Sequence, residues 1–97
     1  MDIQKMLNEA EKLQKSLMAA QSELGNIEVK GSSGGGLIEI LMSGQGELKN
    51  IKIKKEAVNS NDIETLEDLI MSAFKDANNK AVNISKEKIG KLTGGLA

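Results

Sequence analysis

The chain contains no cysteine, histidine, tyrosine, tryptophan or arginine, and Phe74 is its single aromatic residue. Without cysteine it can form no disulfide and no zinc–thiolate site, which fits a cytoplasmic protein. Without histidine or cysteine, no side chain normally titrates near neutral pH, so acid–base catalysis would fall to carboxylates or a perturbed lysine. Nucleophiles would be limited to serine, threonine and lysine. These absences make an enzyme the least favoured class of function.

Other absences bear on the size and surroundings of the protein. Its length suits a single domain over residues 1–97, of which residues 93–97 are expected to form a flexible tail. A core of aliphatic residues with one ring is modest, and small domains are often marginally stable alone. No apolar run approaches the ~18 residues of a membrane span, and Asp2, Glu9 and Glu11 interrupt any signal-peptide pattern. The sequence predicts no metal, no cofactor, no membrane partner and no small-molecule substrate.

A hydrophobic seam opens the chain. Its apolar residues recur alternately three and four residues apart, which is the heptad pattern of a helix that packs on another helix. A helix over residues 3–24 would be about 33 Å long at ~1.5 Å per residue. The rest of so small a chain can hardly cover that length, so the seam predicts association with a second copy. The seam consists of Ile3, Met6, Ala10, Leu13, Leu17, Ala20 and Leu24, with Leu7 beside it.

Alternating apolar residues then predict three strands. These predicted strands cover residues 27–30, 37–43 and 48–54. The Gly/Ser run at 31–36 is expected to be a flexible loop, and the short turn at 44–47 makes the last two strands a hairpin. In the third strand, strict alternation places Ile51 and Ile53 on the face opposite Leu48.

A second helix is predicted from a cap at Asn61 or Asp62 to about Lys91. The order helix, three strands, helix predicts an α+β domain in which helices pack on one face of an antiparallel sheet. The apolar face of this helix comprises Leu66, Ile70, Ala73, Ala77, Ala81 and Ile84, flanked by Ile63, Leu69 and Phe74.

Two candidate chemical sites have simpler explanations. The Gly/Ser run is reminiscent of a phosphate-binding loop, but such a loop is followed by a helix, whereas Leu37 begins a predicted strand. A mobile connection between strands is the better interpretation, with a backbone anion contact as the alternative. Glu67 and Asp68 could be imagined as catalytic, yet acids are favoured in the first turns of any helix. No catalytic residue is therefore assigned.

Charge is segregated along the chain although the total is only −1. Residues 49–55 contain four lysines and no acid, residues 56–74 contain five acids and no base, and residues 75–91 carry a local net charge of +3. On a helical wheel of ~100° per residue, Lys88 and Lys91 continue the apolar stripe of the second helix, so its face turns basic at the tip. Either the tip passes beyond the core and meets something anionic, or these lysines complement the helix dipole and keep a frayed end soluble.

Because every cation is a lysine, the kind of nucleic acid that could be bound is restricted. The bidentate fork that reads guanine needs arginine, whereas lysine is a point charge suited to phosphate. Without aromatic residues, stacking on single strands is disfavoured. Any nucleic-acid ligand is thus expected to be double-stranded and bound with little sequence readout and strong salt dependence. On the first helix, the i,i+4 pairs Lys5–Glu9 and Glu11–Lys15 also offer an ordinary helix-stabilising role.

Several segments together resemble the YbaB/EbfC family of bacterial nucleoid-associated proteins. Residues 27–37, Ile-Glu-Val-Lys-Gly-Ser-Ser-Gly-Gly-Gly-Leu, are similar to the strand, Gly/Ser loop and strand of that family. Residues 66–77, Leu-Glu-Asp-Leu-Ile-Met-Ser-Ala-Phe-Lys-Asp-Ala, are similar to the opening of its last helix. The resemblance covers roughly residues 2–91, and the chain departs from many relatives in its lack of arginine and its slightly acidic total.

The resemblance implies a tweezer-like homodimer whose paired sheets form a body and whose helices project as arms. It also implies a non-enzymatic protein of the cytoplasm and nucleoid that binds double-stranded DNA with low sequence specificity and organises the nucleoid or regulates gene expression. A dimeric scaffold or adaptor for a protein partner is the alternative, which the acidic balance favours. The matching candidates for DNA binding are Lys5, Lys12 and Lys15 on the first helix and Lys80, Lys86, Lys88 and Lys91 on the last.

Overall fold

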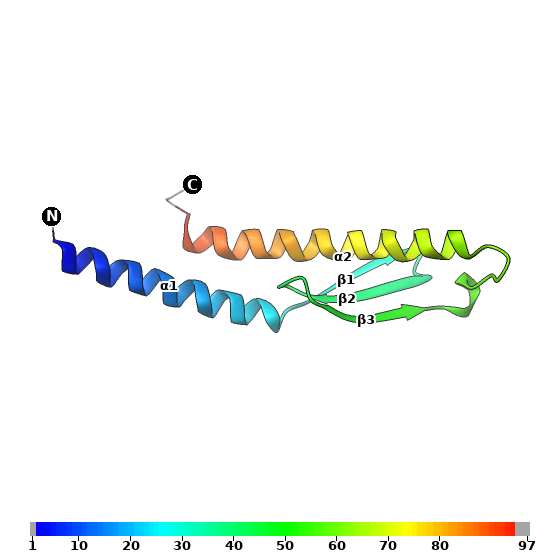
Figure 1. Cartoon of the computed structure of the whole chain (residues 1–97), viewed down its shortest axis with the longest axis horizontal. Helices are drawn as coiled ribbons and strands as arrows, with labels where there is room; N and C mark the ends of the chain where they lie inside the picture. Colours follow the sequence, from blue (N-terminus) through cyan, green and yellow to red (C-terminus); the bar gives the residue numbers. More distant parts are fainter. Residues whose placement is uncertain (1, 95–97) are drawn as a thin grey trace.

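The computed structural model describes residues 2–94 of an elongated molecule of 70 × 22 × 17 Å. It has the predicted order of elements, with a single short 3-10 turn added (Figure 1). Of the tail expected at residues 93–97, residues 95–97 lie outside the described part. The elements are α1 (Ile3–Gly25), β1 (Glu28–Ser33), β2 (Ile38–Ser43), β3 (Leu48–Ile53), η1 (Lys55–Ala57) and α2 (Ile63–Leu92).

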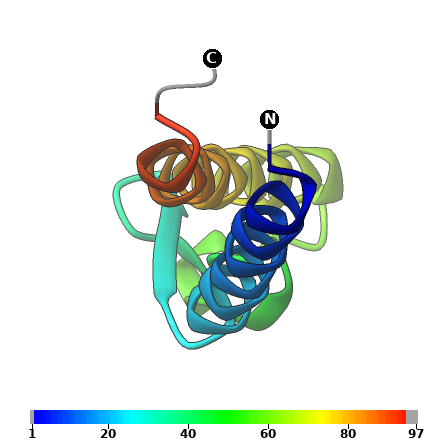
Figure 2. The same ribbon diagram turned by 90° about the vertical axis from the view of Figure 1, so that its left-hand side faces the viewer.

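Helix α1 begins where Asp2 caps it, because the carboxylate of Asp2 accepts hydrogen bonds from the backbone N–H groups of Gln4 (3.1 Å) and Lys5 (3.3 Å). It runs antiparallel to the C-terminal half of α2, and its first turns extend past the end of α2 (Figures 1 and 2). The expectation that both helices pack on the sheet is wrong for α1, which packs on α2 instead.

The seam of α1 is covered unevenly by this packing. Leu24 and Ala20 are 0% and 4% exposed, and Leu13 and Leu17 are half-buried. By contrast, Ile3 is 69% exposed. The chain therefore buries only the last turns of the seam by itself. For its first turns, association with another copy remains a prediction.

The sheet is antiparallel in the order β1-β2-β3, as predicted for the hairpin of β2 and β3. The expectation of a flexible loop at 31–36 is wrong for its first half, since β1 continues to Ser33, which lies opposite Ile38. The reason is tertiary: the backbone of Gly31 lies directly against α2, where a Cβ would collide with the backbone of Ala73 and Ala77. The turn itself covers residues 34–37, and its three glycines, Gly34, Gly35 and Gly36, have positive φ.

Strict alternation fails in β3. Ile51 lies opposite Ile40, but Leu48 lies opposite Met42, so the register shifts by one residue between the two pairs. Leu48 and Ile51 consequently share the face that α2 covers elsewhere, and the prediction that Leu48 faces the other way is wrong. An extra residue in one strand produces this change of face, as in a β-bulge.

The core lies between α2 and the first two strands. Asp62 caps α2, accepting from the N–H of Thr65 (3.2 Å), and Ala73, Ala77 and Ala81 then form a fully buried stripe of small residues. This stripe lets the helix axis approach β1 and β2 closely. All six residues of β3 are exposed, so the sheet extends beyond the edge of the helix. The remaining core residues are Val29, Ile38, Ile40, Met42 and Ala57, with Leu37, Leu66, Leu69, Ile70 and Ile84 packed around them.

Candidate nucleic-acid interface

The seven candidate lysines divide into groups with different surroundings. Lys80 lies beside the sheet, while the others lie on α1 or on the last two turns or so of α2. Their side chains are not equivalent, because some already hold a carboxylate or a carbonyl oxygen. Each group is therefore described by the contacts it makes.

Lys80 joins α2 to β1. Its Nζ donates to the carbonyl oxygen of Lys30 at 2.7 Å and to Oδ2 of Asp76 at 3.3 Å. The same Asp76 oxygen accepts the backbone N–H of Ser32 at 3.0 Å. The Ser32 hydrogen bond, followed by Lys80, lowers the pKa of Asp76. Lys80 thus has a structural role that the sequence did not predict, since no pattern indicated its contact with a carbonyl 50 residues away.

Lys88 lies between the two helices. Its Nζ is 2.6 Å from Oε2 of Glu23 on α1, and its side chain is 31% exposed. The sequence predicted that the basic tip of α2 either meets an anion or merely complements its own dipole. In the described chain Lys88 does meet an anion, and it is a carboxylate of the same molecule.

Lys15 and Lys91 form weaker, local pairs. Lys15 lies 3.9 Å from Glu11 and Lys91 lies 3.8 Å from Glu87, in both cases across one turn of helix. Both lysine side chains are 77% exposed. Such exposed pairs contribute about 0–1 kcal/mol, so they leave these lysines available to another anion.

Lys5, Lys12 and Lys86 are exposed, and within residues 2–94 none has a carboxylate at ion-pair distance. The Lys5–Glu9 pair expected from the spacing is thus absent from the described ion pairs. These three lysines carry uncompensated positive charge on the two helices that project from the sheet (Figure 1).

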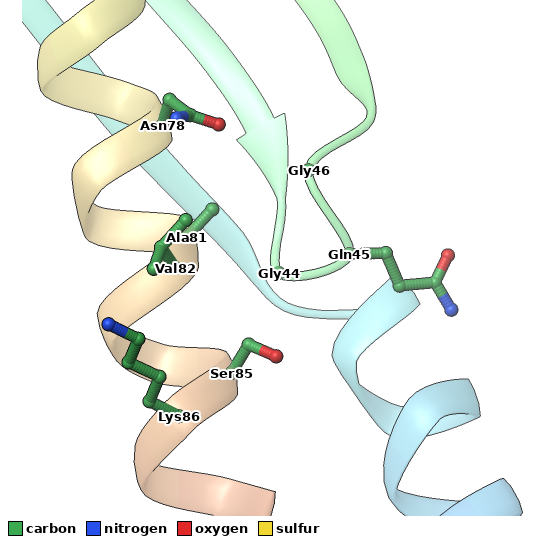
Figure 3. Close-up of a pocket in the computed structure, with 8 residues that line it drawn as sticks. All are labelled: Gly44, Gln45, Gly46, Asn78, Ala81, Val82, Ser85 and Lys86. Atoms are coloured by element: carbon green, nitrogen blue, oxygen red, sulfur yellow. The ribbon is translucent and has the colours of Figure 1, made fainter.

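Lys86 stands at the edge of a cleft of about 370 Å³ between α2 and the turn that joins β2 to β3 (Figure 3). The turn is fixed by Ser43, whose hydroxyl accepts the backbone N–H groups of Gln45 and Glu47, both at 3.2 Å. The Gln45 side chain points away from the cleft and donates to the carbonyl oxygen of Gln21. No acid lines the cleft, whose residues are Gly44, Gln45, Gly46, Asn78, Ala81, Val82, Ser85 and Lys86.

Asn78 and Ser85 were not identified from the sequence. They share a face of α2 with Lys86, and that spacing is visible in the sequence, but many polar residues on a helix surface share a face. Only the fold places the β2–β3 turn beside them. The cleft therefore offers an ammonium, a hydroxyl and an amide, all of which can donate to an anion.

In the part of the chain that the structure describes, neither helix carries an apolar stretch of the length needed to traverse a bilayer. Within those same residues, carboxylates do not gather in threes as they would around a metal ion.

The comparisons with known proteins agree with the resemblance seen in the sequence. The model of the YbaB/EbfC DNA-binding family matches residues 1–96. A nucleoid-associated protein of Rhodococcus jostii is 44% identical over 95 residues, which cover 98% of this chain and 84% of that protein. A nucleoid-associated protein of Mycobacterium tuberculosis is 38% identical over 95 residues, covering 98% and 71%.

A crystal structure of an uncharacterized protein from Helicobacter pylori shares the fold. It matches with a TM-score of 0.86 at 21% identity and covers 97% of this chain and 99% of that one. The match supports the helix, three strands and helix described above, independently of any function. The match of the family model over residues 1–96, together with the relative that is 44% identical over 98% of this chain, shows that the chain belongs to the YbaB/EbfC DNA-binding family.

Proposed function

We propose that this protein binds double-stranded DNA as a homodimer, with low sequence specificity and without enzymatic activity, in the cytoplasm at the nucleoid. There it would organise the nucleoid or regulate gene expression. The family and the nucleoid-associated relatives support DNA as the partner. The observation that carries the proposal is the set of uncompensated lysines on the projecting helices, Lys5, Lys12 and Lys86.

Low specificity follows from the chemistry of those groups. Lysine ammonium groups neutralise phosphates and position a protein on the duplex, but phosphate contacts carry no direct sequence information. The chain has no arginine to read guanine in the major groove. Lys15 and Lys91, whose local pairs are weak, would join the contact when phosphate is present.

The second copy would cover an apolar groove between β3 and α2. This groove has a volume of about 480 Å³, and Lys75 is the only charged residue in its lining. It continues the core beyond the edge of α2, and Phe74, which is 42% exposed, forms part of its wall. The other lining residues are Ile40, Leu48, Ile51, Ile70 and Met71.

A two-fold axis suits this groove because the same surface supplies both a projection and a hollow. Phe74 of each copy could enter the groove of the other, as an isologous interface requires. An apolar patch of this kind on a monomer is commonly an interface. The exposed backbone edge of β3 lies in the same surface, and a second copy would protect it from unspecific pairing.

The DNA proposal is tested with a random-sequence duplex of about 30 base pairs at several salt concentrations. For B-DNA, log Kobs falls against log salt with a slope of about 0.9 per neutralised phosphate. Replacing Lys5, Lys12 and Lys86 together by glutamine should weaken binding and flatten the slope. The matched control is the Lys52, Lys54 and Lys55 triple glutamine variant, which removes the same charge from the sheet region. Wild-type binding that ignores salt, or equal losses in both variants, would contradict the proposal.

The adaptor function remains the second candidate because of the exposed first turns of α1. Ile3, Met6 and Leu7 are 69%, 52% and 59% exposed, which is more apolar surface than a DNA contact requires. An adaptor would hold its protein partner at high salt and in the presence of competitor DNA. A protein that shows no DNA binding at low salt would make this function the leading one.

A further inference from the structure

The ion pair between Glu23 and Lys88 differs from all others in residues 2–94, because it alone joins α1 to α2. The remaining pairs are either within one turn of a helix or within the sheet region. Lys88 and Glu23 are 2.6 Å apart, the shortest separation among these pairs. The contact joins the last turn of α1 to the last turns of α2.

Both residues of this ion pair line a cleft of about 330 Å³, which is separate from the cleft beside the β2–β3 turn. Small residues on α1 leave the space open, and two lysines of α2 border it. Ser16 adds a hydroxyl that can donate, and among the described residues of the lining Glu23 alone is an acid. The full lining is Ser16, Ala19, Ala20, Glu23, Lys88, Lys91 and Leu92.

We infer that Glu23 competes with DNA for Lys88, so that a backbone phosphate replaces the Glu23 carboxylate when the duplex is bound. This inference rests on the proposed function, because it names a residue that limits the affinity of the same site. Without Glu23, the cleft offers two ammonium groups and a hydroxyl to one anionic group.

The two partners are held differently, which permits the exchange. The Glu23 side chain is 62% exposed and can turn into water, whereas the Lys88 side chain is only 31% exposed and stays between the helices. An ion pair this accessible to solvent contributes little to stability. A DNA phosphate attracts the Lys88 ammonium together with the neighbouring phosphates of the duplex, and the contact releases condensed counterions. A single carboxylate offers neither contribution.

The test is a double-mutant cycle read by affinity for the same random duplex. Glu23→Gln should bind DNA about 2- to 5-fold more tightly than wild type, since a solvent-accessible pair of this strength no longer has to be broken. Glu9→Gln is the matched control, because it removes the same charge from α1 at a site with no lysine at ion-pair distance in the described chain. In a Lys88→Gln background, Glu23→Gln should give no gain beyond that of Glu9→Gln.

Several outcomes would overturn the inference. An effect of Glu23→Gln equal to that of Glu9→Gln would do so, as would a gain that persists without Lys88. Weaker DNA binding together with a lower melting temperature in Glu23→Gln would show that the pair only fastens α1 to α2. If the wild type itself binds no DNA, the proposed function fails and the inference fails with it. Because every variant is compared with the wild type, this outcome is distinguishable from a failure of the inference alone.

Discussion

The hydroxyl of Ser33 donates a hydrogen bond to the backbone carbonyl oxygen of Leu69 at 2.5 Å, joining the end of β1 to the second turn of α2 across 36 residues of sequence. The side chain is partly buried at this contact. Such a bond contributes about 0.5–1.5 kcal/mol net. We expect Ser33→Ala to lower the free energy of unfolding by that amount in urea. Ser60→Ala, on the exposed loop before α2, should change it by less than about 0.5 kcal/mol.

The carboxylate of Asp76 makes the free energy of unfolding depend on pH in the acidic range. The Ser32 N–H and Lys80 lower its pKa in the folded protein below the ordinary value of 3.8. The stabilisation from Asp76 is therefore complete above that value and is lost as the pH falls through the folded pKa. Asp76→Asn should be less stable than wild type at neutral pH, and the difference should shrink in acid.

The measurement is urea unfolding of both proteins from about pH 6 to about pH 3. Asp68→Asn is the control, because the Asp68 carboxylate makes no hydrogen bond or ion pair in the described part of the chain. A gap between wild type and Asp76→Asn that stays constant across this range would contradict the assignment.

Gly31 and Gly90 should respond to alanine in opposite directions. A Cβ at Gly31 would meet the α2 backbone, so Gly31→Ala should destabilise the protein by about 1–3 kcal/mol, as overpacking does. At Gly90 nothing lies within 4 Å of a Cβ, and the residue is inside α2. Gly90→Ala should therefore stabilise the protein by up to about 1 kcal/mol. Thermal and urea unfolding of the two variants would check both signs.

Phe74→Asp tests the proposed groove between copies. A charge in the centre of an apolar interface should weaken association by more than about 2 kcal/mol, or roughly 30-fold in the dissociation constant. Sedimentation equilibrium measures this directly. Ile3→Asp serves as the comparison on the exposed end of the α1 seam. If Ile3→Asp dissociates the protein and Phe74→Asp does not, the interface lies on α1, as the heptad pattern first suggested.

Local patterns in the sequence were sufficient for the element order and for the start of α2, which was predicted at Asn61 or Asp62. Asp62 precedes a periodic apolar run, and such a signal depends on neighbouring residues only. Strand length was a different matter. Gly31, Ser32 and Ser33 have the composition of a loop, yet they pair with β2 because α2 lies against the glycine and supplies partners to the serines. Composition could not reveal a contact made by residues more than 30 positions later.

The same distinction applies to the lysines. The sequence indicated that the end of α2 is basic. It could not distinguish Lys80, which donates a hydrogen bond to β1, from Lys86, which borders a cleft. Nor could it show that Lys88 meets Glu23, since their pairing depends on the antiparallel packing of α1 on α2. The count of charged residues identified the basic end of α2. Tertiary packing determined which lysines there contact a carboxylate or a carbonyl oxygen.

The antiparallel arrangement of the helices has a practical consequence for experiments. Ile3 and Leu92 both lie at the end of the molecule that carries the projecting helices, and residues 58–61 lie at the opposite end (Figure 1). A bulky group attached near either of these two residues would therefore lie close to the candidate DNA-binding lysines and add its own charge and bulk there. A fluorophore or surface-immobilisation handle is better introduced by a cysteine substitution at exposed Ser60. Because the natural chain has no cysteine, such a label would attach at that single site.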